Sequence, residues 1–157
     1  MRYVSLSLLC LFIYSCGYSL VSDNPSKLDA LLIFESTPLN KLLVKNIKSN
    51  QGYVGLNLSK TDQVDLKIRI ISQRIGKFLS ATDKNLTPAV GSIEYTLEYE
   101  FILDDKIVSQ SFYDSELYPY NTSNILSNDK ITEKIKNSFL DKALDNIKFN
   151  LIEISNG

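Results

Sequence analysis

The sequence of 157 residues contains no His, no Trp and only two Cys. Without His, Ser-His-Asp catalysis, Cys-His catalysis and imidazole-based zinc sites are excluded. Lys and Arg number 17 against 18 Asp and Glu, so the formal net charge is −1. A nearly neutral chain without a basic block is not expected to hold nucleic acid through its phosphates. We therefore expect no nucleic-acid partner, no metal and no cofactor.

The two cysteines, Cys10 and Cys16, both lie in or next to a short apolar segment at the N-terminus. The segment is too short to span a bilayer, which requires about 20 apolar residues. With Arg2 before it and the small residue Ser15 near its end, it fits a secretory signal peptide. From these features alone, Cys16 is either a residue of that signal, part of a buried strand, or a site of lipid attachment.

The residues around Cys16 favour lipid attachment. Ile13, Tyr14 and Ser15 before it and Gly17 after it resemble the lipobox of bacterial lipoproteins. This resemblance implies cleavage after Ser15, acylation of Cys16 with palmitate or a similar chain, and sorting to the periplasmic leaflet of the outer membrane. The expected organisation is a signal peptide at residues 1–15, an acylated tether at 16–29 and a single α/β domain at 30–157.

The sequence after the tether predicts a helix and marks both of its ends. Thr37 is a good N-cap, Pro38 suits the first helical position, and Gly52 can end the helix. A second, longer helix is predicted at residues 128–154 from apolar residues at four-residue steps. The expected buried residues are Leu39, Leu42, Leu43 and Ile47 in the first helix, and Ile131, Ile135, Phe139, Leu140, Ala143, Leu144, Ile147 and Leu151 in the second.

Three lysines share the opposite face of the first predicted helix. Lys41, Lys45 and Lys48 have the spacing that brings side chains to one side of a helix. They form either an ordinary solvated face or a surface that contacts anionic headgroups.

Alternation of apolar and polar residues predicts strands. The predicted strands cover residues 30–35, 64–70, 93–104 and 106–114, with a tight turn at Asp104 and Asp105. The order of elements indicates an α+β fold, a two-layer sandwich with two helices packed on one face of a roughly four-stranded sheet. Glu94, Glu98 and Glu100 are expected on the open face, where Lys67 and Arg69 can pair with them.

Several segments together resemble the family of the LPS-assembly lipoprotein LptE. They are Cys16-Gly17-Tyr18 with Leu20, the capped first helix, Ser72-Gln73-Arg74, the strand with Glu94-Tyr95, and residues 118–121 before the last helix. The resemblance implies a lipoprotein that plugs the lumen of the LptD β-barrel, assists its assembly and helps lipopolysaccharide reach the cell surface. A nearly neutral, mixed surface suits the polar lumen of a barrel.

Residues 74–87 are expected to form a loop between two strands. Lipopolysaccharide presents phosphates beside acyl chains, so its binding site needs cations next to exposed apolar groups. Arg74, Lys77 and Lys84, close to Phe78 and Leu79, are the candidate lipopolysaccharide-binding residues. Alternatively they are ordinary surface charges, and Phe78 and Leu79 contact the wall of the barrel.

Two other functions fit the sequence less well. An auxiliary lipoprotein of an ABC-type lipid transport system would also combine a lipobox with a small α/β domain. An enzyme without His would need a Ser–Lys dyad or a carboxylate pair, such as Glu98 and Glu100, which project from one strand face about 7 Å apart. Because nothing in the sequence suggests a cleft around them, we expect no catalytic residues.

The lipobox predicts the fate of a cysteine variant. Cys16→Ala should leave an unacylated precursor that no longer partitions with the outer membrane, as membrane fractionation and mass spectrometry would detect. Cys10→Ala is the matched control, since Cys10 would be removed with the signal peptide. Normal outer-membrane partitioning of Cys16→Ala would rule out the lipoprotein assignment.

Overall fold

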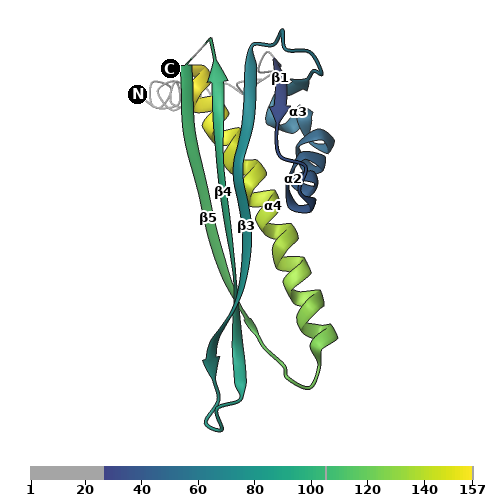
Figure 1. Cartoon of the computed structure of the whole chain (residues 1–157), viewed down its shortest axis with the longest axis vertical. Coiled ribbons are helices and arrows are strands. Elements are labelled where there is room, and N and C mark those ends of the chain that lie inside the picture. Colours follow the sequence, from purple (N-terminus) through teal and green to yellow (C-terminus); the bar gives the residue numbers. More distant parts are fainter. Residues whose placement is uncertain (1–26, 105, 157) are drawn as a thin grey trace, which may run out of the picture.

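The computed structural model describes residues 27–104 and 106–156, which form an open five-stranded sheet with helices on one face (Figure 1). The strand order is β2-β1-β3-β4-β5. The strands are β1 (Leu28–Ile33), β2 (Leu56–Leu58), β3 (Leu66–Thr82), β4 (Pro88–Leu103) and β5 (Lys106–Pro119), and the helices are α2 (Pro38–Ser49), α3 (Gln51–Val54) and α4 (Ile125–Asn156). The predicted α+β sandwich is confirmed, with β2 and α3 as additional short elements.

The first part of the domain is a parallel crossover. β1 pairs in parallel with both β2 and β3, and α2 makes the connection that a parallel pair requires. Thr37 caps α2 as predicted, because its hydroxyl oxygen accepts a hydrogen bond of 3.1 Å from the Asn40 N–H. The predicted end at Gly52 is wrong. α2 ends at Ser49, α3 follows, and Gly55 ends α3 with a φ of 82°, a left-handed conformation that favours glycine.

The buried face of α2 is rotated relative to the prediction. Leu43 and Ile47 are buried as expected, but Asn40 and Val44 complete the face, while Leu42 is exposed. The Asn40 side-chain nitrogen donates a hydrogen bond of 2.9 Å to the Glu35 carbonyl oxygen, whereas its Oδ1 is buried without a partner among the described residues.

The predicted loop at residues 74–87 is wrong, because β3 continues to Thr82 and pairs with β4 as far as Pro88. Only a short tip remains, in which the Asp83 carboxylate accepts hydrogen bonds from the backbone N–H groups of Asn85 and Thr87. A register shift between Ile70 and Ser72 interrupts the alternation along β3. The alternation of apolar and polar residues is therefore lost after Ile70, although the strand itself continues.

The other strand predictions agree better with the structure. Ile93, Tyr95, Leu97, Tyr99 and Phe101 alternate along β4 and are all buried. The turn between β4 and β5 contains Asp104 with a φ of 43°. β1 begins at Leu28, two residues before the predicted boundary between tether and domain.

The open face of the sheet contains one of the predicted ion pairs. Arg69 Nη1 lies 3.2 Å from Glu100 Oε2, whereas Lys67 pairs with Asp62 rather than with a glutamate of β4. Glu98 accepts a hydrogen bond of 2.9 Å from the Ser72 hydroxyl. Glu98 and Glu100 therefore have local partners on this face.

The helical face is closed mainly by α4, and its predicted apolar stripe is buried except for the half-buried Ile131. The Phe139 ring stacks on Tyr95 of β4 with centroids 5.8 Å apart. The Tyr99 hydroxyl donates to Asn146 at 2.9 Å and accepts from the Asn150 amide at 2.7 Å. Burial raises the pKa of Tyr99 to about 12, so this phenol remains neutral in the core.

The sheet is longer than the helical layer, which gives the domain two different ends (Figure 1). The proximal end contains the start of β1, the β4–β5 turn and the C-terminal end of α4. The distal end contains the β3–β4 tip at residues 83–87 and the N-terminal turns of α4. About 13 residues of β3 lie between Arg69, which pairs with the end of β1, and Thr82 at the tip. This is a distance of roughly 43 Å along the strand.

Two phenylalanines on α4 provide a matched test of this packing. Phe139→Ala should lower the free energy of unfolding by about 3–5 kcal/mol, because Phe139 is 0% exposed and stacks on Tyr95. Phe149→Ala is the control, since Phe149 is 68% exposed and its removal should change stability by less than about 0.5 kcal/mol. Urea denaturation measures both, and similar losses in the two variants would contradict the burial of Phe139 against Tyr95.

Candidate functional site

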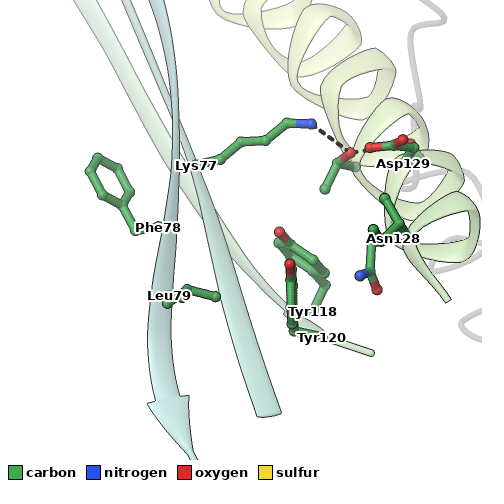
Figure 2. Close-up of a pocket in the computed structure, with 9 residues that line it drawn as sticks. Lys77, Phe78, Leu79, Tyr118, Tyr120, Asn128 and Asp129 are labelled. Carbon is green, nitrogen blue, oxygen red and sulfur yellow. Dashed lines mark hydrogen bonds between the residues drawn. The ribbon is translucent and has the colours of Figure 1, made fainter. Parts of the chain in front are cut away.

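A pocket of about 300 Å³ lies at the distal end, where α4 begins beside the sheet (Figure 2). Its walls come from β3, from the end of β5 and the residues after it, and from the first two turns of α4. The lining residues are Lys77, Phe78, Leu79, Tyr118, Tyr120, Ile125, Asn128, Asp129 and Thr132. Lys77 is the single cationic residue among them.

Lys77 reaches from β3 across to α4 (Figure 2). Its Nζ donates a hydrogen bond of 3.0 Å to Thr132 Oγ1. The Thr132 hydroxyl in turn donates to the Asp129 carbonyl oxygen at 3.1 Å, and Thr132 is buried. Because an ammonium group has three N–H donors, Lys77 retains donors for a bound anion.

Asn128 fixes the segment that leads from β5 into α4. Its buried side chain donates to the Asn121 carbonyl oxygen at 2.8 Å and accepts from the Asn121 N–H at 3.0 Å. These two bonds hold the segment between Tyr120 and Ile125 against the helix, so both residues face the pocket. Asn128 therefore positions the pocket wall.

Tyr118 forms the inner wall and depends on a glycine. Its buried ring lies across Gly91 on β4, where an added Cβ would come within 2.7 Å of the ring atom Cε1. Burial, followed by the nearby Tyr120 and Asp129, raises the pKa of Tyr118. The phenol is thus neutral at physiological pH and available as a hydrogen-bond donor.

The surroundings of the pocket are apolar and exposed. Leu79, Leu86, Ile125 and Leu126 all lie at the distal end with more than half of their surface exposed. The distal end therefore combines one ammonium group, two phenols and the carboxylate of Asp129 with exposed aliphatic side chains. This combination suits a ligand in which an anionic group lies next to an apolar one.

The structure does not bring the three predicted lipopolysaccharide-binding residues together. Lys77 lines the pocket, whereas the neighbouring Arg74 lies on the opposite face of β3 by strand alternation, and Lys84 lies in the tip. Phe78 points away from Lys77 (Figure 2), and its ring covers Gly76. The expected cluster of cations around Phe78 and Leu79 is therefore wrong as a single cluster, while binding by the individual residues stays a prediction.

The sequence interpretation missed Tyr118, Asn128 and Thr132 as pocket residues. Asn128 and Thr132 continue the four-residue steps of the apolar stripe of α4 in its N-terminal direction. Two polar residues on a buried helix face are a signal that could have marked them. Tyr118 and Gly91 are far apart in the sequence, so no local pattern of residues indicates their contact.

Other kinds of site have little support in the described part of the chain. Glu98 and Glu100, considered above as a catalytic pair, bond to Ser72 and Arg69 respectively. Across residues 27–104 and 106–156, no three acidic or thiol side chains are grouped so that they could hold a metal ion. Within the same ranges, no helix has the length and apolarity needed to cross a membrane.

Comparison with known proteins finds similarity at the level of the fold. The sequence matches no protein-family model and no curated protein sequence. The fold is similar to that of rare lipoprotein B from Shewanella oneidensis, with a TM-score of 0.65 and 15% identity, covering 81% of this chain and 96% of that one. It is also similar to a lipoprotein B from Nitrosomonas europaea, with a TM-score of 0.67, 9% identity and coverages of 82% and 84%.

A minor lipoprotein from Acinetobacter baumannii has the same fold, with a TM-score of 0.59, 12% identity and coverages of 80% and 92%. In all three cases the match covers most of both chains. The domain at the C-terminal side of Cys16 therefore has a fold found in bacterial lipoproteins. The predicted signal peptide, Cys16 and most of the predicted tether lie outside the described residues.

The contact between Gly91 and Tyr118 gives a test of the pocket wall. Gly91→Ala should lower the free energy of unfolding by about 1–3 kcal/mol, because the new methyl group must displace the Tyr118 ring. Gly52→Ala is the control, since an added Cβ there meets nothing within 4 Å. Urea denaturation measures both variants.

A double variant separates this contact from other effects of the substitution. In a Tyr118→Ala background, Gly91→Ala should cost much less than in the original chain, because the ring that it displaces is absent. A cost that is the same in both backgrounds would show that Tyr118 does not lie across Gly91.

Proposed function

We propose that this chain is an outer-membrane lipoprotein that acts as LptE does, as a plug and assembly partner of an LptD-type β-barrel during the delivery of lipopolysaccharide to the cell surface. One combination of observations carries the proposal. A lipobox-like segment ends at Cys16, only twelve residues before β1, and the domain that follows has the fold of rare lipoprotein B over 96% of that chain.

The shape of the domain supports a role inside a barrel. The proposed anchor enters at the proximal end, while β3 and β4 extend to the distal end. β3 alone has 17 residues, a length of roughly 55 Å, and the apolar band of a barrel is about 25 Å tall. A domain anchored at the periplasmic leaflet could therefore place its distal end deep in the lumen.

The pocket supports contact with lipopolysaccharide at that distal end. Lys77 would bind a phosphate group, while Leu79 and Ile125 would contact an adjacent acyl chain. Arg74 and Lys84 lie outside the pocket, and each would act separately, Lys84 at the tip and Arg74 in the middle of β3 on its other face. No catalytic step is proposed, since Glu98 and Glu100 are engaged by Ser72 and Arg69 and no cofactor is needed for binding.

Photo-crosslinking in cells tests the partner. A photoreactive residue at Leu86 in the tip or at Tyr113 on β5, which are 82% and 60% exposed, should form an adduct with a large β-barrel protein. The exposed Lys60, between β2 and β3 at the proximal end, is the control position and should give a weaker adduct. Mass spectrometry identifies the partner. Adducts with an ABC transporter or a soluble lipid shuttle would instead support the auxiliary lipoprotein.

Depletion provides a second readout of the same proposal. Cells that lack this chain should accumulate misassembled barrel protein and become more sensitive to antibiotics that lipopolysaccharide normally excludes. An intact envelope after depletion would contradict an essential role in the assembly of the barrel.

A further inference from the structure

The exposed side of α2 forms a second hollow, of about 340 Å³, at some distance from the distal pocket. It is lined by Phe34, Lys41, Val44, Lys45, Lys48 and Ser49. Lys41, Lys45 and Lys48 are all exposed, as predicted, and α2 contains no Asp or Glu. The face is therefore cationic along the whole helix.

The charge of this face is not neutralised by ion pairs. Within the described residues, the ion pairs of the domain involve Lys67, Arg69, Lys136 and Lys142, and none involves a lysine of α2. Asp141 of α4 lies near Lys45 at the edge of α2. Its carboxylate accepts a hydrogen bond of 3.0 Å from Asn46 instead.

We infer that the lysine face of α2 binds the phosphate groups of anionic phospholipids in the membrane to which the chain is anchored. The inference rests on the proposed function for that anchorage. Phosphate fits the three ammonium groups, and the half-buried Phe34 and buried Val44 give the hollow an apolar floor for carbon atoms next to the phosphate.

The spacing of the lysines favours a membrane surface over a free phosphate ion. Lys41 and Lys48 are seven residues apart, which is about 10 Å along the helix axis. One phosphate group is too small to contact both of them together with Lys45. A leaflet presents many phosphates in one plane, so it can satisfy all three lysines at once.

The position of α2 also allows this contact. β1 starts beside the end of α3, where the Leu28 N–H donates to the Gly55 carbonyl oxygen at 3.1 Å. The eleven residues 17–27 between Cys16 and β1 can extend over at most about 38 Å, whereas α2 is about 18 Å long. The anchor therefore holds the lysine face near the leaflet at high effective concentration, so weak individual contacts suffice.

Lysine-specific chemical labelling of the full acylated chain in vesicles tests the inference. In vesicles that contain phosphatidylglycerol, labelling of Lys41, Lys45 and Lys48 should be about fivefold slower than in pure phosphatidylcholine, the factor expected for one lysine at an anionic surface. The exposed Lys134 on α4 is the internal control and should not change. Salt at 1 M should remove the difference, because it reduces the screening length to about 3 Å.

Matched variants and a phosphate control complete the experiment. Lys45→Gln should reduce the protection of Lys41 and Lys48, whereas Lys134→Gln should not. Equal labelling in the two kinds of vesicle would overturn the inference. Equal protection by inorganic phosphate in phosphatidylcholine vesicles would also overturn it, in favour of a site for free phosphate. Either result is compatible with a crosslink to the barrel, so failure here is distinguishable from failure of the proposed function.

Discussion

The packing of β4 against α4 is the contact on which the rest of the structure depends. β4 is hydrogen-bonded along almost its whole length to β3 on one side and β5 on the other. Its alternate side chains form the centre of the core, where Phe139 stacks on Tyr95 and two asparagines of α4 hold the Tyr99 hydroxyl. Because α4 fixes the inner face of β4, β4 in turn sets the register of β3 and β5.

This arrangement explains why the two ends of the domain differ. β3 and β4 continue past the first turns of α4, so no helix covers the hairpin beyond that point (Figure 1). Aliphatic side chains there, such as Leu79 and Leu86, remain exposed. The distal pocket lies where cover by α4 begins, between a helix end fixed by Asn128 and a ring that lies on Gly91. The pocket is thus a consequence of unequal lengths in the two layers.

The sequence predicts the elements that are long and regular, because period two along β4 and four-residue steps along α4 reflect burial directly. It fails where backbone geometry interrupts a pattern. The register shift after Ile70 makes the second half of β3 look like a loop, and β2 is too short to show a period. Lys77 could be chosen from its chemistry, but its contact with Thr132 depends on how the sheet and α4 meet, 55 residues apart in the chain.

The nearly neutral composition conceals an uneven distribution of charge. Four cations, Lys67, Arg69, Lys136 and Lys142, are paired with carboxylates at 2.6 to 3.5 Å. The three lysines of α2 are not paired in this way, and Lys77 bonds to a hydroxyl group rather than to a carboxylate. Paired charges are satisfied within the domain, whereas unpaired ones attract anions from outside it. Under the proposed function, the same domain would therefore present cations to phosphates at two separate places, the leaflet near its anchor and a lipid at its far end.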